Sequence, residues 1–140
     1  MKTTFGSSVL TFLLVTASSQ CFAEITVGDI SPARAKTLGV TLRTEKNGDA
    51  GVKVWLEFKT EGELKKFNYI ELQIGDGEDR IMSAPLLVSH PSQGSVVVTF
   101  SAYPAYLPKS TLMIAVYHGP KGDVGYRFKV KDFIELDKPR

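Results

Sequence analysis

Apolar and polar residues alternate with a period of two in this chain, and this pattern restricts the fold more than any other feature. In residues 52–59 every second side chain, beginning with Val52, is apolar, and Lys, Trp, Glu and Lys stand between them. Residues 70–74 and 126–131 have the same pattern. Because successive side chains of a β-strand point to opposite faces, this period indicates strands that each bury one face.

Two further segments, residues 96–100 and 112–117, are almost continuously apolar. Such runs are typical of central strands covered on both faces. Weaker strand candidates lie at residues 25–28, 40–44 and 81–88. Because Pro85 has no N–H to donate to a ladder, we predict that the last of these is an edge strand or carries a bulge.

Turn residues separate the predicted strands. Residues 47–49, 75–77 and 119–123 contain the Gly, Asn and Asp residues that tolerate tight turns. A helical signal occurs at Ser31, which can cap a helix, followed by Pro32 at the first helical position. We therefore predict one short helix in a chain that is otherwise built of strands and turns.

Seven to eight short strands with almost no helix predict an all-β protein. The expected fold is a single immunoglobulin-like antiparallel β-sandwich that occupies residues 24–140, and a small β-barrel is the alternative. The similarity is one of architecture only, since the chain has one cysteine and lacks the pair that brackets a strand Trp in antibody domains.

Residues 1–23 have the pattern of a signal peptide. Lys2 supplies a positive start, and residues 9–15 form an apolar run that is too short to cross a bilayer. The segment ends in Cys21-Phe22-Ala23, which has the small-x-small spacing of a cleavage site. We predict cleavage after Ala23 and a secreted or periplasmic protein.

Cys21 allows a second interpretation, as the acylated cysteine of a bacterial lipoprotein. The preceding Ser18 is polar and Gln20 is bulky, and neither suits lipoprotein processing. Ordinary cleavage is therefore favoured. Cleavage removes the only thiol, so the mature domain would have neither a disulfide nor a cysteine nucleophile.

The charge is nearly balanced, with 17 Lys and Arg residues against 15 Asp and Glu residues and a net charge of +2. This gives no electrostatic reason to expect a nucleic-acid partner. No apolar stretch reaches membrane-spanning length. Arg127, Lys129 and Lys131 alternate along the predicted last strand, and we expect them to form a solvated face.

The segment from Tyr103 to Pro108 is the first candidate binding site. It contains Tyr103, Tyr106 and two prolines. Prolines stiffen a loop, and tyrosines offer a large contact area at low entropic cost, which suits recognition. The alternative is a loop folded over the end of the core with each hydroxyl bonded to the backbone.

Trp55 and Tyr69 form the second candidate binding surface. By alternation, each points away from the core of its strand. If the two strands pair as a hairpin, the rings share one outer face and resemble a surface that stacks on carbohydrates or peptides. The alternative is that Trp55 covers its cross-strand neighbours or lies under a loop.

His90, His118 and Asp123 are weaker candidates for a metal site. If the strands run up and down, the turns that hold them fall at one end of the sandwich. Imidazole and carboxylate groups suit zinc or copper. No two of these residues have the spacing of a ligand pair on one element, so we expect no metal or other cofactor.

Catalytic motifs are missing from the sequence, which has no Gly-x-Ser-x-Gly elbow, His-Glu-x-x-His motif or phosphate-binding glycine loop. We therefore expect an exported, non-catalytic module that binds a protein or glycan partner, and we leave its oligomeric state open. The alternatives are a small periplasmic metal-binding protein that uses His90 and His118, and an enzyme assembled from separate loops. Candidate carboxylates for such an enzyme are Glu57, Glu61, Glu71 and Asp76.

Overall fold

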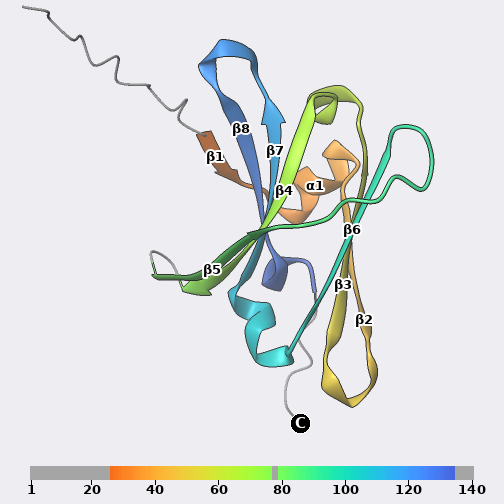
Figure 1. The fold of residues 1–140 in the computed structure, drawn as a ribbon, viewed down its shortest axis with the longest axis vertical. Helices are drawn as coiled ribbons and strands as arrows, with labels where there is room; N and C mark the ends of the chain where they lie inside the picture. Colours follow the sequence, from red (N-terminus) through yellow and green to blue (C-terminus); the bar gives the residue numbers. More distant parts are fainter. Residues whose placement is uncertain (1–25, 77–78, 135–140) are drawn as a thin grey trace, which may run out of the picture.

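The computed structural model describes residues 26–76 and 79–134, which form a mainly β structure with two sheets (Figure 1). The five-stranded sheet has the order β1 (Thr26–Asp29), β8 (Asp123–Lys129), β7 (Ser110–Tyr117), β4 (Phe67–Asp76) and β5 (Asp79–Pro85). The three-stranded sheet has the order β2 (Thr41–Lys46), β3 (Val52–Lys59) and β6 (Ser95–Ala102). The predicted signal peptide, residues 1–23, lies outside the described residues.

The hydrophobic core contains residues from both sheets. In β3 the alternation has the predicted effect, because Val54, Leu56 and Phe58 are buried and the residues between them are not. The Phe58 ring meets Phe67 of the other sheet edge-on, with ring centroids 5.3 Å apart. Other buried residues of this core include Val96, Val98, Ile70, Leu72, Leu112, Ile114, Val116 and Phe128.

The predicted short helix is confirmed as α1 (Pro32–Leu38). The Ser31 side chain accepts a hydrogen bond of 3.2 Å from the Arg34 N–H, and Pro32 starts the helix. The helix ends at Gly39, whose φ of 72° is a left-handed conformation that favours glycine. Ala35 is buried in the core and Leu38 packs partly against it, so α1 contacts the sandwich through these two side chains.

The hairpin on which a common face of Trp55 and Tyr69 depends does not form. β3 pairs with β2 and β6, whereas β4 pairs with β5 and β7. The chain crosses from one sheet to the other through the 3₁₀ turn η2 (Gly62–Leu64), and Leu64 is buried in the core. Because burial of Leu64 holds this crossing between the layers, β4 joins the opposite sheet.

The sheet order tests the predicted positions of β5, β6 and β7. β7 is a central strand and β5 is an edge strand, as predicted. β6 was expected to be central, but it lies at an edge, where Ser89 pairs with Val97 and covers part of its free side. The expectation of wholly antiparallel sheets is wrong at one pair, since β1 runs parallel to β8.

Candidate functional site

The 3₁₀ turn η3 (Pro104–Lys109) connects β6 to β7. It contains Tyr106, and Tyr103 directly precedes it as the N-cap. The Tyr106 N–H donates to the Tyr103 carbonyl at 2.9 Å, and the Ser110 hydroxyl donates to the Tyr106 carbonyl at 2.8 Å. Leu107 is only 3% exposed and packs in the core. The backbone of this turn is therefore fixed to the end of the sandwich.

The rings of Tyr103 and Tyr106 remain in solvent, although their backbone is fixed. Their exposed fractions are 63% and 46%. Neither hydroxyl has a hydrogen-bond partner among residues 26–76 and 79–134. The segment folds over the end of the core, as the alternative interpretation expects. The hydroxyls do not bond to the backbone of the described residues, so the second part of that interpretation is not met.

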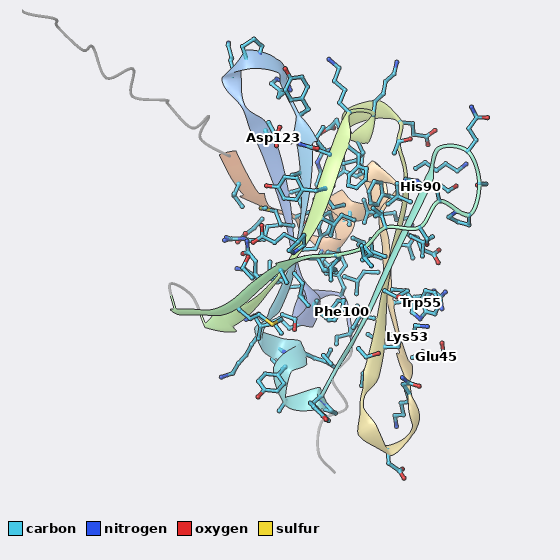
Figure 2. All side chains as sticks on the ribbon, viewed as in Figure 1. Glu45, Lys53, Trp55, His90, Phe100 and Asp123 are labelled. Atoms are coloured by element: carbon cyan, nitrogen blue, oxygen red, sulfur yellow. The ribbon has the colours of Figure 1, made fainter. Side chains whose placement is uncertain are left out.

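Trp55 lies on the outer face of the three-stranded sheet, in the middle of β3 (Figure 2). The Arg43 guanidinium and the Lys53 ammonium lie over its ring, 4.5 and 4.2 Å from the centroid. Glu57 in turn pairs with Arg43 at 3.4 Å. Because two cations already cover the half-buried ring, Trp55 offers little free surface for stacking on a ligand.

The indole Nε1 of Trp55 is buried and has no hydrogen-bond partner among the residues that the structure describes. A buried donor without a partner is destabilising. We expect Trp55→Phe to cost less than about 1 kcal/mol of unfolding free energy, because it removes this donor while keeping a ring under both cations. Urea denaturation measures this change in unfolding free energy. If Trp55→Phe lost as much unfolding free energy as Trp55→Ala, the prediction would be contradicted.

Tyr69 lies in β4, opposite Ala115 of β7, and is half-buried on the outer face of the five-stranded sheet. Burial raises the pKa of its hydroxyl, and the carboxylates of Glu71 and Asp123 raise it further. Trp55 and Tyr69 therefore belong to outer faces of different sheets, and the expected common aromatic surface does not form.

Two of the three metal-ligand candidates, His90 and Asp123, have separate side-chain partners, and His118 has a backbone bond. The Nδ1 atom of His90 lies 3.0 Å from the Ser95 carbonyl oxygen, and the Asn68 amide donates to Asp123 at 3.2 Å. The backbone N–H of His118 donates to the Gly122 carbonyl at 3.1 Å. Figure 2 places His90 next to the start of β6 and Asp123 at the β7–β8 turn. The described part of the chain holds no group of three or more His, Cys, Asp or Glu residues that could bind a metal ion.

The candidate carboxylates are also separated. Glu57 and Glu61 line an open depression of about 480 Å³ at one end of the three-stranded sheet. Glu71 lies in the other sheet, where it accepts hydrogen bonds from Gln73 and Ser83. The side chain of Asp76 lies outside the described part of the structure. This arrangement does not bring the four candidates into one site.

A charge cluster that the sequence did not reveal joins β1 to β8. Asp29 accepts hydrogen bonds from Arg127 and from Lys129, the latter at 3.0 Å. These two bonds hold the pKa of the Asp29 carboxyl at about 2, below its usual value of 3.8. Two of the three residues in the predicted basic stripe are therefore paired with a carboxylate.

Asp29 makes the stability of the fold depend on pH. Because its pKa is lower in the folded state, its contribution is complete above pH 4 and is lost as the pH falls towards 2. All three side chains are partly exposed, so solvent screening limits the effect to about 1 kcal/mol or less. Urea denaturation should show that Asp29→Asn is less stable than the wild type near neutral pH and equally stable near pH 2. A difference in unfolding free energy that stays the same from neutral pH to pH 2 would contradict this prediction. Asp49→Asn is the control variant.

A second cluster joins α1, η2 and β8. Glu63 receives two hydrogen bonds from the Arg34 guanidinium, at 2.6 and 2.7 Å, and one from the Tyr126 hydroxyl at 3.2 Å. Arg34 holds the pKa of the Glu63 carboxyl below its usual value, and Tyr126 adds to this effect. These contacts connect the helix to the crossing at Leu64, so their role is in the fold.

The comparisons with known proteins give no family. No family model matches the chain, and no curated protein matches it. Within the described residues, no helix is long and apolar enough to span a membrane.

Proposed function

We propose that the protein is an exported, non-catalytic binding module that contacts an envelope or extracellular partner through Tyr103 and Tyr106. One observation carries this proposal: two exposed tyrosine rings stand on a backbone that is fixed by Leu107 and Ser110. Binding costs less entropy when the contacting groups are already ordered. Tyrosines on a fixed turn meet that requirement, because each has few rotatable bonds and a large contact area.

The strand order supports an immunoglobulin-like assignment. β8, β7, β4 and β5 correspond to the G, F, C and C′ strands of such sandwiches, and β2, β3 and β6 correspond to A, B and E. In this assignment η3 connects the E and F strands at one end of the sandwich. Recognition by a loop at the end of a rigid sandwich is a common use of this architecture.

The proposed export depends on the N-terminal sequence. Cleavage after Ala23 would release residues 24–140 to the periplasm or the medium. Mass measurement on the protein recovered from an exporting cell tests this step. An N-terminus at Glu24 supports export by an ordinary signal peptide, and a lipidated Cys21 contradicts it.

The proposed binding surface predicts the effect of removing both rings. Tyr103→Ala combined with Tyr106→Ala should abolish capture of the partner from an envelope extract, while the melting temperature stays close to that of the wild type. Tyr117→Ala is the matched control. This tyrosine is 50% exposed and lies at the opposite end of β7 from η3. Equal capture by the double variant and the wild type would contradict the proposal.

A further inference from the structure

The free edge of β6 is half covered and half open. Ser89 and Val97 exchange both backbone hydrogen bonds, each 2.9 Å long, on the side of β6 that faces away from β3. The Ser95 N–H also donates away from β3, to the Ser92 carbonyl at 3.0 Å. Residues 89–92 of the chain thus satisfy the outward-facing groups in the first half of this strand.

In the second half of β6 the corresponding groups have no partner. β6 pairs with β3 without a register shift from Ser95 to Ala102. Because backbone groups alternate along a strand, the N–H and C=O groups of Thr99 and Ser101 point away from β3, as those of Val97 do. Neither residue has a backbone partner on that side among the described residues, and both are exposed.

The composition of β6 does not protect this edge. Proteins usually guard free edges with charged residues, proline or short strands. β2, at the other edge of the same sheet, contains Arg43, Glu45 and Lys46, and the edge strand β5 ends in Pro85. β6 has the sequence SVVVTFSA, which contains no charge and no proline. Its open half therefore provides a template for another strand.

The open half of the edge is continuous with the proposed binding loop. Ala102 ends β6 and is followed directly by Tyr103. A strand added beside Thr99 and Ser101 would thus end next to the two tyrosines. Backbone hydrogen bonds would supply affinity, and contacts with the tyrosine rings would supply specificity.

We propose that the partner contributes an extended, uncharged peptide segment that adds to the three-stranded sheet as a strand beside Thr99 and Ser101. This inference rests on the proposed function, because it names the kind of partner that the tyrosine loop recognises. Each of the two residues donates one N–H bond to the segment and accepts one in return.

In the register that pairs the open residues of both copies with each other, a second copy of the chain fits this edge less well. If two β6 strands paired antiparallel so that Thr99 faced Ser101 of the second copy, Val97 would face that copy's Tyr103. The outward groups of Val97 already bind Ser89, so the second copy's chain would have to occupy the place of Ser89. A short peptide segment can end before that point, which favours a peptide as the occupant.

The test uses short random peptides displayed on phage, selected on the purified protein and then resynthesised. Thr99→Pro removes one outward N–H and leaves the bonds to β3 intact. We expect it to weaken binding of the selected peptides roughly tenfold or more, from the loss of a backbone bond and the contacts that it aligns. Thr44→Pro is the matched control, because its N–H points outward from the β2 edge of the same sheet. It should leave the affinity unchanged.

Amide hydrogen exchange on the wild type provides a readout that needs no variant. Bound peptide should slow exchange at Thr99 and Ser101, the two open N–H groups. Peptides that bind without protecting these amides, or that bind Thr99→Pro as tightly as the wild type, would overturn the inference. Failure to select any binding peptide would also count against the inference. So would a dimer of the protein that Thr99→Pro dissociates, because a second copy would then be the occupant of the edge.

The same peptides separate this inference from the proposed function. If Tyr103→Ala with Tyr106→Ala abolishes binding and Thr99→Pro does not, the tyrosine loop stands and the added strand is wrong. If only Thr99→Pro abolishes binding, the added strand stands and the tyrosine loop is wrong. Loss of binding in both variants, with Tyr117→Ala unaffected, supports both.

Discussion

Phe128→Ala is expected to lower the free energy of unfolding by about 3–5 kcal/mol, because it removes a fully buried ring from the core. Phe128 lies in β8 opposite Leu112 of the central strand β7, and its ring centroid is 5.8 Å from that of Phe133. Leu112 is fixed in a paired strand, so it cannot collapse into the space. Domains of this size are stable by about 5–15 kcal/mol, so the loss would be a large share of the total.

Urea denaturation of wild type and variant, followed by tryptophan fluorescence and by circular dichroism, measures this loss. Phe133→Ala is the matched control, since Phe133 touches the same ring but is only half-buried. It should cost clearly less than Phe128→Ala. Equal losses for the two variants, or a loss below about 1 kcal/mol for Phe128→Ala, would show that the core at β8 is not packed as described.

Local features of the fold followed from local sequence signals. The alternation in residues 52–59 correctly predicted β3 and which of its side chains are buried. The Ser31-Pro32 pair correctly predicted the start of α1. Such signals are readable because burial on one face, or a cap, depends on residues that are close together in the sequence.

Pairing between strands could not be predicted in the same way. The hairpin considered between the strands of Trp55 and Tyr69 does not form, and the chain instead crosses between the sheets at the buried Leu64. A single buried leucine in a loop gives no periodic signal. The position of β6 was also wrong, because an apolar strand at an edge that the chain itself partly covers has the same composition as a central strand.

The candidate sites likewise divide into those indicated by local sequence and those that depend on strand pairing. Prolines and tyrosines in one segment indicated the exposed turn at Tyr103 and Tyr106, and the structure describes both rings as exposed. The ion pairs of Asp29 depend on Arg127, which is 98 positions away, and on Lys129, and the parallel pairing of β1 with β8 brings these residues close. The open groups of Thr99 and Ser101 depend on which side of β6 faces β3, which only the sheet order fixes.

Leu107→Ala is expected to affect both stability and binding, because Leu107 is the buried residue beneath the tyrosine turn. Removing a buried leucine side chain costs about 2–5 kcal/mol, and the value depends on how far the site can collapse. In a turn at the end of the sandwich, the backbone can relax more than in a central strand. We therefore expect a loss towards the lower end of this range, with η3 released from the core.

Release of η3 would weaken binding although both tyrosines remain, since the rings would have to be ordered again at each binding event. Leu87→Ala is the control, because Leu87 is 95% exposed and its removal should change stability by no more than about 0.5 kcal/mol. Isothermal titration with a selected peptide should show a less favourable binding entropy for Leu107→Ala at temperatures where the variant is folded. Wild-type affinity in a destabilised Leu107→Ala would mean that the tyrosines bind without a fixed backbone, and the argument from preorganisation would be wrong.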